Sequence, residues 1–148
     1  MKKILVALDG SPRQAGVLQV AAKLASDSGA KLILFRAVGL PSEPSLVEAY
    51  SMSPADYTTT LEKRARDELE VTARQLGADK VLRVHVELGS PWDAICRGAR
   101  ADEVDMIVLG SHGYDVVDRF LGTTAAKVVN HADRTVVVVR SPERLTAS

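Results

Sequence analysis

Short runs of apolar, mostly β-branched residues alternate along the chain with longer segments in which apolar residues recur every three or four positions. Runs of the first kind predict β-strands, and segments of the second kind predict amphipathic helices. The predicted strands cover residues 4–8, 32–38, 81–88, 104–109 and 135–139. Strands that alternate with helices in this way are typical of a parallel α/β sheet.

The polarity of each predicted strand indicates where it lies in the sheet. Residues 4–8 and 104–109 are almost wholly apolar, as expected of central strands that helices cover on both faces. In contrast, Arg83, His85 and Glu87 alternate with apolar residues within 81–88. We therefore place this third strand toward an edge of the sheet.

Four helices are predicted between these strands, from apolar residues at helical spacing. They fall around residues 17–24, 61–76, 92–99 and 125–132. Ser11 followed by Pro12 is a good start for the first helix, because the hydroxyl can cap free N–H groups and proline has no N–H to leave unpaired. Gly29 and Gly77 are placed to end the first and second helices.

The length of 148 residues suits one domain, residues 1–148. Residues 39–56 interrupt the pattern with three prolines and four serines, which predicts an irregular loop that serves either as a mobile lid or as a partner-binding excursion. Residues 141–148, which begin with Ser-Pro, are predicted to be a flexible tail.

The charge balance excludes some classes of partner. The 19 basic residues equal the 19 acidic ones, which argues against nucleic acid or an acidic membrane surface as the partner. The lone Cys96 fits a reducing compartment. The first apolar stretch has no more than five residues and ends at Asp9, so we expect no export signal, no membrane span and a cytoplasmic location.

Glycines and hydroxyl residues follow the two predicted central strands and begin the last helix. These residues are Asp9, Gly10 and Ser11 after the first strand, Gly110, Ser111, His112 and Gly113 after the fourth, and Gly122, Thr123 and Thr124 at the helix start. Flexible backbone beside a helix N-terminus is suited to binding phosphate, and in a parallel sheet such a site lies beyond the carboxyl ends of the strands. The sequence contains neither a GxxxxGKS/T loop nor a GxGxxG fingerprint, so neither P-loop hydrolysis nor the usual dinucleotide site is indicated.

These motifs, together with residues 4–11 and 136–140, resemble the universal stress protein family over essentially the whole chain. The resemblance implies a five-stranded, Rossmann-like α/β domain with helices on both faces and the strand order 3-2-1-4-5. The family is usually dimeric. One of its branches binds ATP through the motif G-x2-G-x9-G-S/T, and another branch lacks this motif.

The resemblance also assigns binding roles to individual residues. It implies that Asp9 meets the ribose or the phosphates, that Ala37 lies by the adenine, that Leu109 and Gly110 approach the nucleoside, and that Gly113, Gly122 and Thr123 hold the phosphates. The sequence departs from the motif in one respect, because only eight residues separate Gly113 from Gly122. One missing residue can shift the N–H groups of this loop by about 3 Å.

Two features near the glycine motif allow alternative interpretations. Asp115 and Asp118 could join Asp9 around a bound Mg²⁺, although we favour the interpretation that they face solvent. His112 next to Ser111 suggests a hydrolase, but neighbours in sequence rarely face each other and no acidic partner is evident. We therefore expect His112 to contact a ligand rather than to act in catalysis.

Three functions remain open at this stage. The first is an ATP-binding or related adenine-nucleotide-binding universal stress protein, in which the nucleotide is a regulatory ligand. The second is weak ATP hydrolysis or phosphoryl transfer. The third is an interaction module without a nucleotide. For each of these three functions we expect a homodimer formed through Thr135–Val139, because four consecutive valines at an exposed sheet edge would be prone to aggregate. Burial of this strand inside the sheet is the alternative.

Overall fold

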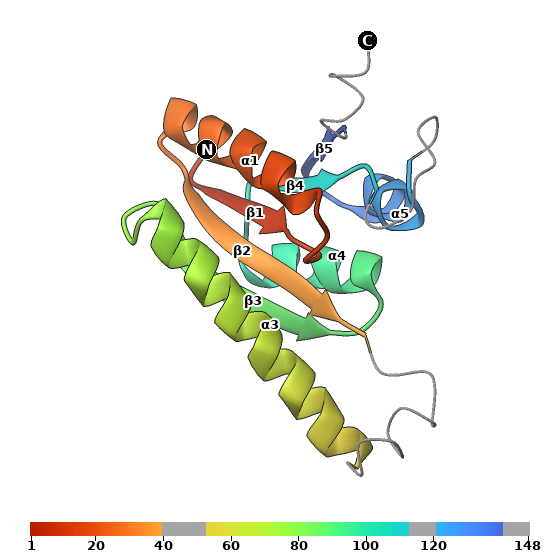
Figure 1. The fold of residues 1–148 in the computed structure, drawn as a ribbon. Helices are drawn as coiled ribbons and strands as arrows, with labels where there is room; N and C mark the ends of the chain where they lie inside the picture. Colours follow the sequence, from red (N-terminus) through yellow and green to blue (C-terminus); the bar gives the residue numbers. More distant parts are fainter. Residues whose placement is uncertain (40–52, 113–120, 141–148) are drawn as a thin grey trace.

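Five parallel strands form the centre of the molecule in the computed structural model, which describes residues 1–39, 53–112 and 121–140 (Figure 1). The strands are β1 (Lys3–Ala7), β2 (Lys31–Val38), β3 (Val81–Leu88), β4 (Met106–Gly110) and β5 (Thr135–Val139). Their order is β3-β2-β1-β4-β5, and each neighbouring pair is parallel. The predicted α/β class and the strand order 3-2-1-4-5 are confirmed.

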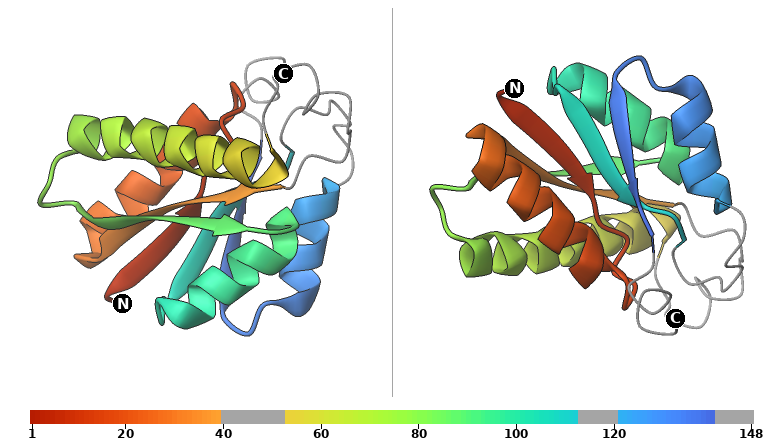
Figure 2. Two further views of the ribbon diagram at one scale, coloured as in Figure 1. Left: turned by 90° about the horizontal axis from the view of Figure 1, so that it is seen from below. Right: turned by 90° about the horizontal axis from the view of Figure 1, so that it is seen from above.

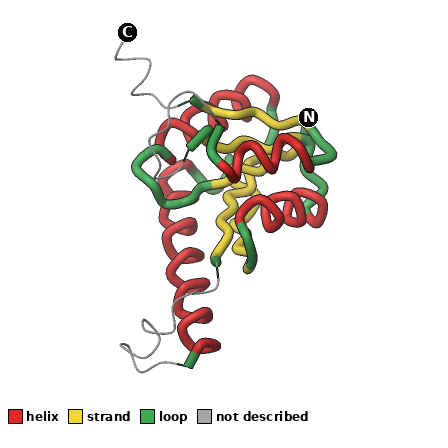
Figure 3. The backbone as a smooth tube through the Cα atoms, turned by 90° about the vertical axis from the view of Figure 1, so that its right-hand side faces the viewer, coloured by secondary structure: helices red, strands yellow, loops and turns green. Residues whose placement is uncertain are grey.

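Helices cover both faces of this sheet (Figure 2). They are α1 (Gln14–Ser28) and α3 (Pro54–Leu76) on one face and α4 (Pro91–Ala101) and α5 (Thr123–His131) on the other. The helix α3 runs along β2 and β3, and its first turns extend past the ends of the strands (Figures 1 and 3). Gly29 and Gly77 follow the ends of α1 and α3, as predicted.

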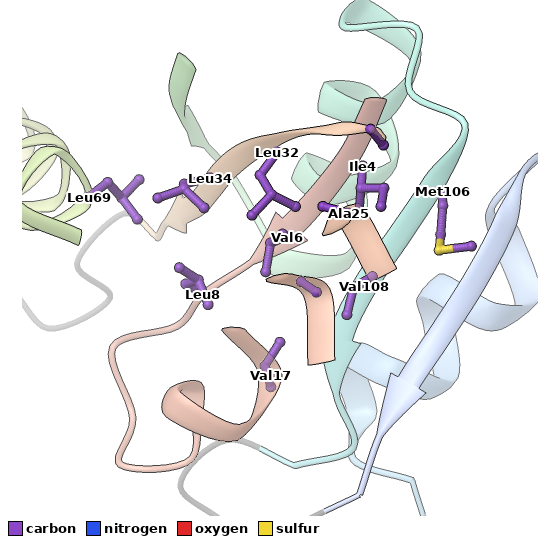
Figure 4. Packing of buried hydrophobic residues seen from close by; sticks show 12 residues of the cluster. Ile4, Val6, Leu8, Val17, Ala25, Leu32, Leu34, Leu69, Met106 and Val108 are labelled. Atoms are coloured by element: carbon purple, nitrogen blue, oxygen red, sulfur yellow. The ribbon is translucent and has the colours of Figure 1, made fainter. Parts of the chain in front are cut away.

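Two-sided burial explains the apolar strand sequences. Along β1, Ile4 and Val6 face the core under α1 and α3 (Figure 4), whereas Leu5 faces the core under α4 and α5. All three side chains are fully buried. A strand with both faces covered cannot show the polar and apolar alternation of a half-exposed strand.

Two helix starts differ from the prediction. The helix α1 begins at Gln14, because the main-chain N–H of Ser11 donates to the Asp9 carboxylate (2.9 Å) and the Gln14 N–H donates to the Ser11 carbonyl (3.1 Å). These bonds form a turn before the helix. The irregular segment predicted over 39–56 is too long at its end, because α3 begins at Pro54 and the Ser53 hydroxyl caps it by accepting the Asp56 N–H (3.1 Å). Residues 40–52 and 141–148 lie outside the described residues.

β3 is an edge strand, as its polar residues predicted. The imidazole of His85 lies between two carboxylates, 2.7 Å from Oδ2 of Asp102 and 2.9 Å from Oε1 of Glu87. Arg97 of α4 donates to the other oxygen of Glu87 (2.9 Å) and to the Leu88 carbonyl (2.9 Å). Paired charges thus line this edge of the sheet.

Candidate functional site

A cavity of about 430 Å³ opens where β1, β2 and β4 end. The chain passes from β1 to β2 on one side and the sheet continues to β4 on the other, so this is the point at which the winding direction reverses. The predicted residues that line the cavity are Asp9, Ser11, Ala37, Leu109, Gly110, His112, Gly122, Thr123 and Thr124. Gly113 lies outside the described residues.

Gly10 shapes the β1 side of the cavity and does not line it. Its φ of +79° is a left-handed conformation that favours glycine. Its N–H donates to Oε1 of Gln14 (2.9 Å), and a Cβ at this position would lie 3.6 Å from the Arg36 guanidinium. Gly10 therefore fixes the turn that carries Asp9 and Ser11.

The two ends of the glycine motif meet on the β4 side. The N–H of Gly122 donates to the Ser111 carbonyl (2.7 Å), and the N–H of Ser111 donates to the Val139 carbonyl (2.8 Å). A Cβ on Gly122 would lie only 2.9 Å from the Ser111 carbonyl oxygen, so glycine permits this close approach. The eight-residue spacing therefore does not separate the start of α5 from the end of β4.

The N-terminus of α5 faces this junction. The first helical hydrogen bond runs from the Ala126 N–H to the Gly122 carbonyl (2.9 Å), so the N–H groups of Thr123, Thr124 and Ala125 have no acceptor within the helix. The first turn contains no acidic residue, and Gly122 provides no side-chain cap. Free N–H groups and the positive end of the helix dipole make this terminus suited to an anion.

Arg13 and Arg36 also line the cavity, and the sequence analysis missed both. Nε of Arg36 donates to the Leu8 carbonyl (3.0 Å), and its guanidinium pairs with Glu68 of α3. The signal for Arg36 was present, because it is the one charged residue in an otherwise apolar run at 32–38. Asp9 is the single carboxylate among the described lining residues, which also include Arg13 and Arg36, and the charge of Arg36 is paired with Glu68.

Ser111 and His112 contact each other, contrary to the expectation from their adjacency. Both are buried, with 2% and 8% of their surfaces exposed. The Ser111 hydroxyl lies 3.1 Å from Nδ1 of His112. Within residues 1–39, 53–112 and 121–140 no carboxylate bonds to this ring, and Nε2 of His112 has no hydrogen-bond partner.

Trp92 and Cys96 are the tryptophan and the cysteine of the chain, and neither lines the cavity. Trp92 packs against the core under α4 and α5, with the His131 ring 4.6 Å away between centroids and Nζ of Lys127 5.7 Å from its ring. Cys96 is buried, and this burial raises the pKa of its thiol. Both residues therefore belong to the packed interior under α4 and α5.

Neither a metal cluster nor a membrane span is found in the part of the chain that the structure describes. No group of three or more His, Cys, Asp or Glu side chains there could hold a metal ion. No helix among these residues is both long and apolar enough to cross a membrane. Asp115 and Asp118 lie outside the described residues.

The doubly wound sheet and the cavity at its switch point define a Rossmann-like α/β domain with a ligand cavity. The chain belongs to the universal stress protein family, whose profile matches residues 1–140. It is 30% identical over 145 residues to a universal stress protein of Staphylococcus haemolyticus, covering 96% of this chain and 86% of that one. A second relative, from Staphylococcus saprophyticus, is 27% identical over 147 residues, covering 96% of this chain and 85% of the relative.

Solved structures share this fold. The universal stress protein UspA from Lactobacillus plantarum superposes with a TM-score of 0.77 at 25% identity, covering 94% of this chain and 97% of that one. A universal stress protein solved in complex with cAMP superposes with a TM-score of 0.63 at 24% identity, covering 93% and 95%. The fold is therefore common to proteins that share about a quarter of their residues with this chain.

Proposed function

We propose that this chain binds an adenine nucleotide, ATP or a close relative, as a regulatory ligand in a stress response. The observation that carries the proposal is the start of α5, whose free N–H groups meet a cavity that also holds Arg13 and Arg36. Such a site favours a ligand with several negative charges. The triphosphate of ATP provides them.

The shape of the cavity supports the same ligand. Its volume of about 430 Å³ falls within the range of roughly 300–1,000 Å³ that small-molecule sites occupy. In the proposed arrangement the adenine lies by Ala37 and Leu109, and the phosphates lie by Gly122, Thr123 and Thr124. The related protein solved with cAMP gives additional support for an adenine ligand.

Asp9 is the described residue that would help to hold a Mg²⁺ ion brought in with ATP. Its Oδ1 accepts the Ser11 N–H, which leaves the other carboxylate oxygen for the metal or for its water ligands. Nucleotide-bound Mg²⁺ takes one or two protein carboxylates and keeps several waters. The fit is therefore with Mg²⁺ carried by the nucleotide rather than with a resident ion.

A charge placed at the start of α5 tests this proposal. The exposed Thr123 is replaced by Asp, with Thr123→Asn as the neutral control of similar shape. An acidic residue in the first turn favours the free helix, but it repels the phosphates by about 1–3 kcal/mol per unit of phosphate charge at an effective dielectric of 20–40 and a separation of about 6–8 Å.

Calorimetric titration with MgATP and with adenosine measures the effect. We expect Thr123→Asp to weaken ATP binding at least tenfold relative to Thr123→Asn and to leave adenosine binding unchanged. The proposal fails if the unaltered protein binds no adenine nucleotide, or if both variants bind ATP equally well.

We also propose that the chain is a cytoplasmic homodimer joined through β5. The valines of β5 are half-buried, and β5 pairs with β4 on one side only among the described residues. The single cysteine is a free thiol, as is usual in a reducing compartment. Light scattering on the purified protein is expected to give twice the chain mass of 15.9 kDa, and a monomer at micromolar concentration would contradict the dimer. If the protein is a dimer but binds no adenine nucleotide, the interaction module is the better description.

A further inference from the structure

The imidazole of His112 has one nitrogen with a hydrogen-bond partner and one without. Nδ1 lies 3.1 Å from the Ser111 hydroxyl, whereas Nε2 has no hydrogen-bond partner and almost no exposed surface in the described part of the chain. A buried polar atom without a partner costs roughly 1–3 kcal/mol, and native structures rarely keep one without a reason. Since Nε2 has almost no exposed surface, it can gain a partner only when a bound ligand displaces the atoms that cover it.

The buried Ser111 hydroxyl indicates which nitrogen carries the proton. If the hydroxyl donates to Nδ1, the serine keeps only spare lone pairs, and the ring proton is on Nε2. If Nδ1 donates instead, the serine hydrogen has no acceptor among the described contacts, which costs more than an unused lone pair. The first arrangement is favoured, and it makes Nε2 a hydrogen-bond donor.

The position of the ring indicates what this donor meets. His112 lines the cavity, and Cδ2, the ring atom bonded to Nε2, would lie 3.7 Å from a Cβ on Gly122, the N-cap of α5. Cδ2 therefore lies beside the N-cap of α5, and Nε2 is the ring nitrogen bonded to it. An acceptor that binds beside this helix start is an anionic oxygen.

We infer that His112 donates a hydrogen bond from Nε2 to a phosphate oxygen of the ligand and that Ser111 is a positioning residue that fixes the tautomer. This inference rests on the proposed function, because it assigns a role within the same cavity. It explains the unpaired nitrogen as a group that is satisfied only when a phosphorylated ligand is bound. The contact distinguishes phosphorylated ligands from the bare nucleoside.

Nitrogen-15 NMR of the imidazole tests the tautomer and the contact directly. In the free protein we expect the proton on Nε2 and none on Nδ1. Ser111→Ala should give a mixture of the two tautomers, whereas Ser111→Thr should keep the proton on Nε2. Addition of MgATP should shift the Nε2–H signal, and adenosine should leave it in place. A proton on Nδ1, or an Nε2–H signal that ATP does not move, overturns the inference.

Matched substitutions at His112 test the energetic effect. The amide nitrogen of Gln lies near the position of Nε2, whereas that of Asn lies near Nδ1. We expect His112→Asn to weaken ATP binding roughly tenfold to a hundredfold, which is the range for a hydrogen bond to a charged group, and His112→Gln to stay within about threefold of the unaltered protein. Adenosine binding should be equal in all three proteins. Equal ATP affinity in all three would overturn the inference while the proposed function stands.

A separate probe applies if the unaltered protein binds no adenine nucleotide. In that case the proposed function fails, and inorganic tripolyphosphate is titrated while the Nε2–H signal is followed. A saturable shift supports His112 as a phosphate donor independently of adenine. No shift at millimolar concentration overturns the inference as well.

Discussion

Gly98 of α4 lies against the ring of Phe35, and an added methyl group there should destabilise the protein. A Cβ on Gly98 would lie 2.6 Å from Cε2 and 3.1 Å from Cδ2 of Phe35, both shorter than an ordinary contact of 3.4–4 Å. Phe35 is fully buried, and its ring also makes a T-shaped contact with the ring of His85, with the ring centroids 5.2 Å apart. The ring therefore cannot move away without displacing other core groups.

The expected size follows from two opposing effects of Gly98→Ala. Overpacking a close-packed core costs about 1–3 kcal/mol. Alanine in place of glycine inside a helix returns about 1 kcal/mol. The net loss in the free energy of unfolding is about 1 kcal/mol, which corresponds to a fall in Tm of about 2–4 °C for a domain of this size.

Replacing Phe35 by Leu tests whether the contact with the ring is the cause. The shorter side chain removes the atoms that the new methyl group meets, so Gly98→Ala should raise stability by about 1 kcal/mol in the Phe35→Leu background. Urea denaturation of the four proteins measures the cycle. The reasoning is refuted if Gly98→Ala stabilises the protein with Phe35 present, or if its effect is the same in both backgrounds.

Three further predictions concern the termini of elements and the buried thiol. The Asp105 carboxylate accepts two main-chain N–H groups at the start of β1, at 2.7 and 3.0 Å, and these bonds hold its pKa below the usual range. The ionised carboxylate therefore stabilises the fold at neutral pH, and this stabilisation is lost on acidification. Asp105→Asn should lower the urea midpoint at pH 7 and make little difference near pH 2. Ser53→Ala removes the N-cap of α3 and should cost about 1 kcal/mol, with faster amide exchange in the first turn, whereas Ser53→Asp should restore both. Burial raises the pKa of the Cys96 thiol and shields it, so the thiol should react with iodoacetamide only as fast as the protein opens. Urea should then accelerate labelling in parallel with unfolding. Rapid labelling of the native protein would contradict the burial of Cys96.

The sheet could be predicted from the sequence because burial on both faces leaves a clear signal. Only the fourth strand begins noticeably later than predicted, at Met106 instead of residue 104. There, the N–H of the buried Val104 donates to the Ala99 carbonyl of α4 (3.1 Å), and the exposed Asp105 bonds to the start of β1 through its N–H and its carboxylate. Both residues thus lead into β4 before the strand begins. Composition alone does not distinguish such a lead-in from the strand itself.

The site could be predicted only as far as local motifs extend. Glycines and hydroxyl residues after a strand indicate the end of the sheet at which a ligand binds, and among the described ones all but Gly10 line one cavity. Arg36 stands out as the one charged residue of its run, but the sequence does not place it in the cavity, because its position depends on bonds to Leu8 and Glu68, which are distant in sequence. The late start of α1 has a different cause, since the Asp9 carboxylate accepts the Ser11 N–H and the Ser11 hydroxyl accepts the Arg13 N–H (3.3 Å), which together hold a turn before the helix.

The two borders of the sheet are unlike, and this limits how copies of the chain could join. At β3, the ion pair between Glu87 and Arg97 lies at the border beside the His85 ring, whereas β5 presents a row of valines. A second chain can extend the sheet at only one of these borders without stripping water from charged groups. If copies of the chain join by pairing strands at the β5 border, the assembly would thus stop at two chains instead of continuing into a filament.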